Sequence, residues 1–173
     1  MSKPDSLLIC ISIPFAGTFL PALYTARFLK EKLGSSAFVC IGGGFVNTEL
    51  REARDPALAK YIDAISYDRG YGSYHALLGT RNTAQTNRHA ELVSASPLYK
   101  MRLFVQRADG TILVTDPLWS SLDFEKYENE MTAKIVPDYS DIDFSIYPRM
   151  CDDANAMHRI WTDGAWIKAY LAH

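Results

Sequence analysis

The fold class that this sequence predicts is α/β, with a partial parallel sheet, an appended β-hairpin and a linker. Two runs, 7–11 and 38–41, are apolar at every position, and a stretch with helical periodicity lies between them. Each run ends in a loop that is rich in glycine or proline. Strands that are buried on both faces are apolar throughout, and parallel strands need a long crossover, usually a helix. The pattern therefore predicts a strand–helix–strand unit over 7–44.

The crossover is predicted to be a helix from Thr18 to Leu33. Thr18 is a candidate N-cap, Pro21 suits the first turn, and Gly34 is a candidate stop. The apolar residues that recur at helical spacing on the predicted inner face are Phe19, Ala22, Leu23, Ala26, Leu29 and Leu33. Charged residues fall largely on the opposite face, namely Arg27, Lys30, Glu31 and Lys32. The helix should therefore cover one face of the sheet.

Beyond Gly44 the alternation of elements continues. The expected elements are a helix at 48–53, a second helix at 55–61 capped by Asp55, a strand at 64–67, a turn at 68–72 and a helix at 73–78 with Ser73 as a candidate cap. Strands and helices that alternate in this order favour a right-handed parallel sheet.

The second half of the chain has different signals. Residues 80–100 begin without an apolar period, and either an inserted segment or an ordinary polar connection explains them. Asp109-Gly110 lies between two β-rich runs, 101–106 and 111–115, which indicates a hairpin. The elements expected after it are a helix at 123–131, an extended linker at 137–143, a hairpin at 161–166 and a strand at 167–172. The predicted divisions are therefore 1–79, 80–100, 101–136 and 137–173.

Composition excludes several classes of function. The chain has 173 residues, 48% of them hydrophobic, and a net charge of −2, which gives no sign of nucleic-acid binding. No apolar run reaches the roughly 18 residues of a membrane span, and the N-terminus has no signal-peptide pattern, so a cytoplasmic location is expected. The three cysteines are far apart, and Cys10 and Cys40 fall in predicted strands, so small hydrophobic roles are favoured over a disulfide or metal site.

Candidate binding residues follow the predicted strands. Ligands bind outside the carboxyl ends of parallel strands, where Ser12, the loop Gly42-Gly43-Gly44 and Asp68 are expected. The glycines suit either a ligand cradle or a tight strand-to-helix turn, and Asp68 suits either a pocket or a turn. If the loop holds a ligand, a Cβ at residue 43 should disturb binding more than folding. No catalytic triad, P-loop or H-E-x-x-H pattern is present, so no catalytic or metal residue is predicted.

Two stretches resemble a known domain. Ser12-Ile13-Pro14, 27 residues and then Gly42-Gly43 resemble the S-x-L…G-G half of the cobalamin-binding domain signature, with Pro14 where the family usually has Leu. The segments 41–51 and 63–68 resemble the cobalamin domain of radical SAM (S-adenosylmethionine) iron–sulfur proteins. The resemblance covers about 7–79 and 101–173. It implies a partial, Rossmann-like cobalamin-binding-like sheet.

The resemblance also implies a function. The chain would be the N-terminal, non-catalytic part of a radical SAM, Fe-S oxidoreductase-type protein, and Ser12, Pro14, Gly42, Gly43, Gly44 and Asp68 would contact cobalamin. The family's cobalt-ligating D-x-H-x-x-G loop is absent from this sequence, so ligation by His is not expected. The iron–sulfur cluster and S-adenosylmethionine would bind to a C-x-x-x-C-x-x-C loop that the family has further downstream. The partner would be the rest of the parent chain.

Two alternatives belong to other classes. One is a doubly wound nucleotide- or flavin-binding module, although G-x-G-x-x-G would require glycine where Asn47 stands. The other is an interaction module. The family sheet has two further strands ahead of these, so the strand at 7–11 or its neighbour should have a bare edge that recruits a second copy or another segment of the chain.

Overall fold

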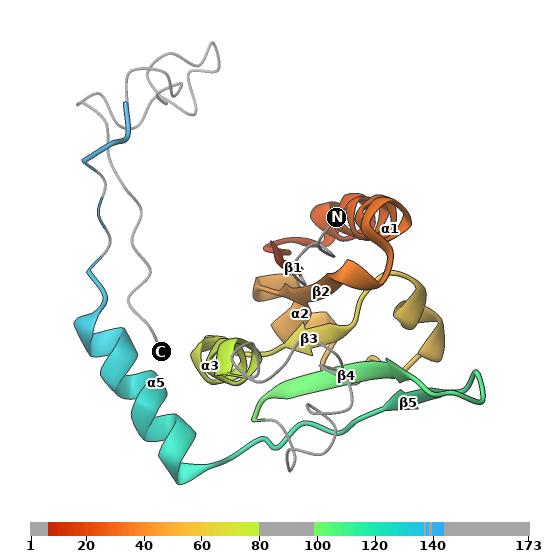
Figure 1. The fold of residues 1–173 in the computed structure, drawn as a ribbon. Coiled ribbons are helices and arrows are strands. Elements are labelled where there is room, and N and C mark those ends of the chain that lie inside the picture. Colours follow the sequence, from red (N-terminus) through yellow and green to blue (C-terminus); the bar gives the residue numbers. More distant parts are fainter. Residues whose placement is uncertain (1–6, 80–98, 137, 139, 144–173) are drawn as a thin grey trace, which may run out of the picture. The chain divides into compact units, whose positions relative to one another are not determined.

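The computed structural model describes residues 7–79, 99–136, 138 and 140–143, and it confirms an α/β fold (Figure 1). The chain divides into two compact units, 1–134 and 135–173, and every helix and strand described below belongs to the first. The alternatives for 80–98, Cys151, the predicted hairpin at 161–166 and the predicted strand at 167–172 lie outside the described residues.

The sheet has five strands in the order β1-β2-β3-β4-β5. Their bounds are Leu7–Ser12, Ala37–Gly42, Ala64–Ser66, Met101–Gln106 and Ile112–Val114. The first three strands are parallel, as predicted. The predicted hairpin forms β4 and β5, and it is attached to the sheet because β4 pairs antiparallel with β3. The sheet is therefore mixed, with a parallel half followed by an antiparallel half.

The two predicted buried strands differ in burial. All six residues of β2 are buried, as the apolar run predicted. The same prediction is wrong for β1, in which no residue is buried, because β1 is the edge strand of the sheet. Ile9 and Ile11 still pack against the core on one face, whereas Cys10 and Ser12 are exposed.

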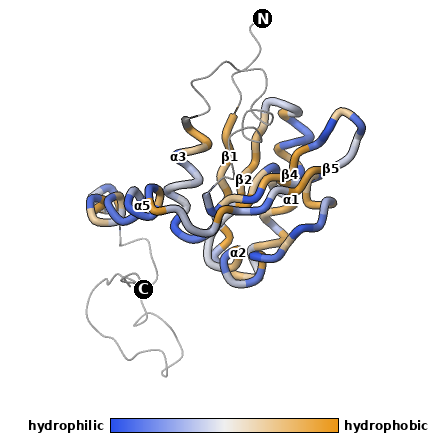
Figure 2. Tube along the Cα trace, turned by 90° about the horizontal axis from the view of Figure 1, so that it is seen from below, coloured by the Kyte–Doolittle hydropathy of each residue, from blue (hydrophilic) through white to orange (hydrophobic). Residues whose placement is uncertain are grey.

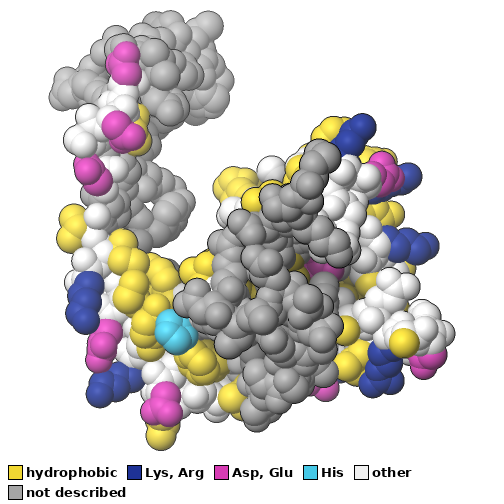
Figure 3. All heavy atoms as spheres, viewed as in Figure 1, with side chains coloured by type: hydrophobic (Ala, Val, Ile, Leu, Met, Phe, Trp, Pro, Cys, Tyr) yellow, Lys and Arg dark blue, Asp and Glu magenta, His cyan; other side chains and the backbone are white. Residues whose placement is uncertain are grey.

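Helices cover the sheet on both faces. The larger core lies where α1 (Phe19–Leu33) and α2 (Gly44–Glu49) meet the sheet, and it includes Ala22, Ala26 and Val46. The smaller core joins Phe38 and Cys40 of β2 to Leu77 of α3 (Tyr71–Gly79). Figure 2 shows β1, β2 and β4 as hydrophobic segments, whereas α5 (Leu122–Lys134) is mainly hydrophilic. Apolar side chains gather where α5 meets α3 (Figure 3).

The starts of several helices differ from the predictions. The helix predicted at 48–53 is α2 at Gly44–Glu49, because Gly43 starts it directly after β2. Thr18 precedes α1, but its hydroxyl donates to the Phe15 carbonyl (2.7 Å) and does not cap the helix. Three 3-10 turns also occur, namely η1 (Ala16–Thr18), η2 (Gly34–Ser36) and η3 (Pro56–Lys60). Asp55 caps η3 as predicted, because its carboxylate accepts from the Ala57 N–H (2.8 Å).

Two other predictions about side chains are wrong. Ser73 is not a cap, because α3 begins at Tyr71 and the buried Ser73 hydroxyl donates to the carbonyls of Tyr99 (3.3 Å) and Lys100 (3.2 Å). Lys30 does not lie on a solvated face of α1, because it is half-buried and forms an ion pair with Asp63, the residue that precedes β3. Both side chains bind groups distant in sequence, which helical periodicity does not report.

Candidate functional site

The carboxyl ends of β1, β2 and β3 meet at one end of the sheet, as predicted. Ser12 lies opposite Gly42 in the β1–β2 ladder. A Cβ added to Gly42 would lie 3.2 Å from the Ser66 carbonyl oxygen of the next strand. Ser12, Gly42 and Ser66 therefore form a row of small residues across three strands, which we call the carboxyl-end row. Ser12 is exposed, and Gly42 and Ser66 are buried.

Gly43 and Gly44 contact the chain's own backbone. Gly43 has a φ of +108°, and a Cβ there would lie 2.8 Å from both the N and the O of Ile13. A Cβ on Gly44 would lie 3.1 Å from the Pro14 carbonyl oxygen. The Ile13 N–H donates to the Gly42 carbonyl (2.7 Å), and the Phe45 N–H donates to the Ile13 carbonyl (3.1 Å). The close approach that requires glycine at position 43 is thus made by Ile13, and both glycines serve the turn between β2 and α2.

The buried Ser66 hydroxyl is an orphan group in the carboxyl-end row. Its Oγ has no hydrogen-bond partner within the described part of the chain. It lies beneath α3, where a Cβ on Gly70 would be 3.3 Å from Ser66 Oγ and 2.9 Å from the Tyr74 ring. Buried hydroxyls are usually hydrogen-bonded, so this oxygen is available to a small polar group.

The thiols beside this row are poor nucleophiles. Cys10 and Cys40 are opposite each other in the β1–β2 ladder, and both are free thiols. Burial raises the pKa of the Cys40 thiol far above its usual range, and burial also raises the pKa of Cys10, against a hydrogen bond with Tyr74 that lowers it. Burial likewise raises the pKa of Tyr74. The thiolate is the reactive form of cysteine, and a raised pKa keeps these thiols protonated. Cys10 and Cys40 are therefore better suited to packing and hydrogen bonding than to covalent catalysis.

Asp68 follows β3 and is held in place on several sides. Its backbone N–H donates to Asn47 Oδ1 (2.7 Å), and Asn47 Nδ2 donates to its carbonyl (3.4 Å). Its carboxylate forms ion pairs with Arg51 and with Lys100 (3.1 Å). Asp68 and Lys100 have φ values of 55° and 45°, which are uncommon for non-glycine residues. The carboxylate of Asp68 is therefore committed to two cations of the chain itself.

The ion pairs extend to a buried glutamate. Glu128 of α5 is 4% exposed, lies 3.6 Å from Lys100 Nζ and accepts from the Tyr99 hydroxyl (3.4 Å) and the Gly72 N–H (3.4 Å). Burial lowers the pKa of Lys100, but hydrogen bonds with Tyr99 and Asp68 and the neighbouring carboxylates outweigh it and raise that pKa well above its usual value. Lys100 therefore stays charged and links β4, α5 and the Asp68 loop.

Sequence reasoning missed Arg51, Lys100, Glu128 and Arg102. Arg102 is 1% exposed and donates to the carbonyls of Arg51 (2.7 Å) and Ala53 (2.9 Å) and to the Tyr67 hydroxyl (2.9 Å). An arginine inside the otherwise apolar run 101–105 was the one available signal, because arginine is seldom fully buried without partners. The other three partners are far apart in sequence and have no diagnostic spacing.

The described residues show neither a metal-binding cluster nor a membrane-spanning helix. In this part of the chain, no three His, Cys, Asp or Glu side chains cluster in a way that could hold a metal ion. None of the described helices combines the length and hydrophobicity needed to cross a membrane. Comparisons of the chain with protein-family models, curated proteins and solved structures gave no match.

Proposed function

We propose that this chain is a cobalamin-binding-like domain that places a cofactor and performs no chemistry itself, within a radical SAM iron–sulfur protein. The observation that supports this best is the register of Ser12 with Gly42, which brings the two stretches of the resemblance together at the carboxyl end of a parallel sheet. Ligands of open α/β sheets bind at this end.

The six predicted contact residues differ in how well they fit a cofactor. Ser12, Pro14 and Gly44 are exposed at the carboxyl end. Ile13 occupies the space beside Gly43, and Asp68 forms ion pairs with two cations, so neither residue offers a free contact to a ligand. The orphan Ser66 hydroxyl beside Gly42 is an additional candidate. Ser12, the exposed member of the carboxyl-end row, is therefore the residue that would contact the cofactor, with Pro14 and Gly44 beside it.

Bound cobalamin would supply the organometallic chemistry, and the protein would supply position. The carboxyl-end row carries no charge, so it suits neutral hydroxyl and amide groups of a ligand. The ion pairs around Asp68 stiffen the loop that borders the row. The contribution of this chain would be a rigid surface that orients the ligand.

The test is a titration of the purified chain with hydroxocobalamin, followed by the corrin absorbance spectrum and by calorimetry. Ser12→Leu should weaken binding about ten-fold, since it adds bulk at an exposed position of the row without entering the core. Ser35→Leu is the matched control, the same exchange at an exposed position near the amino end of β2. An unchanged spectrum with no heat would end the proposal. Saturable binding of flavin mononucleotide or ATP, without binding of cobalamin, would establish the nucleotide alternative.

A second candidate is association of two copies through β1. No residue of β1 is buried, and on its outer side no described strand pairs with it. Unpaired edges recruit strands, and a C2 dimer would pair β1 antiparallel with its own copy. Cys10 is exposed on this edge, so Cys10→Lys should convert a dimer to a monomer in light scattering, and Thr25→Lys on α1 should not. A wild-type monomer at all concentrations would exclude this candidate.

A further inference from the structure

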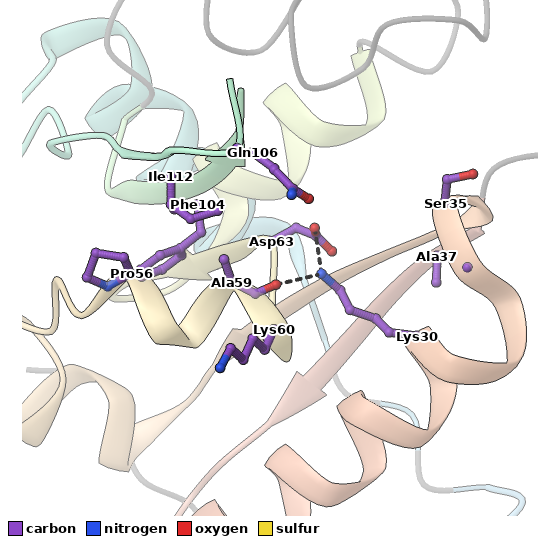
Figure 4. A pocket seen from close by; sticks show the side chains of 12 residues that line it. Lys30, Ser35, Ala37, Pro56, Ala59, Lys60, Asp63, Phe104, Gln106 and Ile112 are labelled. Carbon is purple, nitrogen blue, oxygen red and sulfur yellow. Dashed lines mark hydrogen bonds and ion pairs between the residues drawn. The ribbon is translucent and has the colours of Figure 1, made fainter. Parts of the chain in front are cut away.

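A groove of about 720 Å³ lies at the amino end of β2 and β3, opposite the carboxyl-end row (Figure 4). Its position follows from the lining residues. Ala37 is the first residue of β2, Asp63 directly precedes β3, Gln106 ends β4 and Ile112 begins β5. The volume is within the range of small-molecule sites, roughly 300–1,000 Å³. None of the residues predicted from the sequence to bind a ligand lies in it.

One ammonium group in the groove is fixed in position. Lys30 Nζ lies 2.8 Å from Asp63 Oδ1 and 3.4 Å from the Ala59 carbonyl oxygen. Asp63 is 6% exposed, and its other oxygen accepts from the Val39 N–H (2.8 Å). An ammonium group has three donors, and these two contacts use two of them. Lys30 is thus held by a buried carboxylate and keeps one donor for a ligand.

The balance of charge in the groove is positive. Two lysines, Lys30 and Lys60, line it together with one carboxylate, that of Asp63. Both oxygens of Asp63 already have partners within the chain. Because the acid is neutralised, the second lysine supplies the net charge, and a ligand that carries one negative charge would match it.

The apolar part of the lining sets the shape of a ligand. Phe104, Ile112 and Pro56 lie together on one side of the groove, and the side chains of Lys30, Asp63 and Gln106 gather on the other (Figure 4). Ligand sites commonly combine an apolar wall with a few placed polar groups. A flat apolar body could lie on this wall while an acidic group reaches Lys30.

We infer that this groove binds a small organic monoanion, a carboxylate attached to a flat apolar ring. The carboxylate accepts from Lys30 Nζ and is neutralised by Lys60, and the ring packs on Pro56 and Ile112. Charge-assisted hydrogen bonds of this kind are stronger than neutral ones, and the apolar wall adds burial. This inference uses none of the residues of the carboxyl-end row, so the two proposals stand or fall separately.

The test uses benzoate, benzamide and benzylamine as probes of similar size and different charge, with the amide spectrum of the full chain followed by NMR at low ionic strength. Benzoate should give saturable shifts at Ala37, Gln106 and Ile112 with a dissociation constant on the order of 1 mM. Benzamide should bind about ten-fold more weakly, and benzylamine should not bind. Equal affinity for benzoate and benzamide, or no saturation by benzoate, would overturn the inference.

Two variants at exposed positions locate the site. Lys60→Gln removes the second cation, and Gln106→Glu adds a like charge, so each should weaken benzoate about three-fold, the size expected for exposed charges. Lys126→Gln on α5 is the matched control for loss of a surface lysine and should leave the affinity unchanged. All three changes lie outside the core, so thermal unfolding should match the wild type. Benzoate affinities that do not differ among the three variants would place binding elsewhere and overturn the assignment.

Discussion

Gly43→Ala should destabilise the fold, whether or not a ligand binds at the loop. Gly43 has a φ of +108°, which L-residues rarely adopt, and the left-handed backbone alone costs about 1–2 kcal/mol. The new Cβ would also lie 2.8 Å from the N and O of Ile13, and both of these backbone atoms form hydrogen bonds in the turn. Overpacking of a well-packed site costs about 1–3 kcal/mol. The expected loss of unfolding free energy is therefore about 2–5 kcal/mol.

The measurement is urea unfolding followed by circular dichroism, together with the melting temperature. For a chain of this size, 1 kcal/mol corresponds to roughly 2–4 °C, so the melting temperature should fall by roughly 4–20 °C. Gly17→Ala is the control, because a Cβ there meets nothing within 4 Å and its φ is not left-handed. Gly44→Ala should fall between the two, since its Cβ would lie 3.1 Å from the Pro14 oxygen.

A Gly43→Ala protein as stable as Gly17→Ala would refute this reasoning. It would mean that the turn adjusts without cost and that Ile13 does not determine the residue at 43. This expectation reverses the one drawn from sequence alone, in which a Cβ at 43 disturbs binding more than folding. The physical reason is that the space beside Gly43 is occupied by backbone of the β1–α1 connection.

Three other substitutions should show which buried polar groups hold the elements together. Asp63→Ala should cost about 2–4 kcal/mol in urea unfolding, because Lys30 and the Val39 N–H lose a nearly buried partner. Asp55→Ala is the comparison and should cost about 1 kcal/mol, because it removes only the cap of η3. Equal losses in the two variants would contradict this. Arg102→Met should cost about 3 kcal/mol in the same assay, since three backbone carbonyls lose their donor, and a loss below about 1 kcal/mol would show that water replaces it. Burial raises the pKa of Tyr67 to about 12, against Arg102 which lowers it, so its contribution to stability is present below the unfolded value of 10.0 and is lost as pH rises through 12. Unfolding free energy should therefore fall less steeply between pH 10 and 12 in Tyr67→Phe than in the wild type, and identical slopes would exclude this.

Local sequence signals predicted the elements well, and tertiary contacts explain where they failed. Asp55 and the Asp109-Gly110 turn act within a few residues, and the structure confirms both. The run at 7–11 has the same apolar character as β2, but its burial depends on what lies beside it in the sheet. Helical periodicity predicted that Lys30 faces solvent, whereas its ion pair with Asp63, 33 residues away, holds it in the groove.

The candidate sites could likewise be predicted where the signal is local, and not where it depends on tertiary contacts. The positions of Ser12 and Gly42 could be predicted, because the ends of parallel strands meet wherever the strands pair. The partners of Asp68 could not, since Arg51 and Lys100 approach it from different elements. The groove was also beyond prediction, because its lining comes from α1, η2, η3 and three strands. A groove assembled from so many elements leaves no spacing in the sequence to detect.

The two ends of the sheet differ in where charge remains available, and this separates the ligands that each can hold. At the carboxyl end, Asp68, Arg51, Lys100 and Glu128 neutralise one another, and the row beside them is neutral. At the amino end, Asp63 is satisfied by Lys30 and Val39, while Lys60 adds a cation to the same groove. A lysine charge that no carboxylate offsets attracts an anion, whereas a network of charges that offset one another does not. A neutral, hydrogen-bonding ligand therefore belongs at the carboxyl end, and an anion at the amino end. A chain that binds both cobalamin and benzoate should bind them without competition, since their sites lie at opposite ends of the same strands.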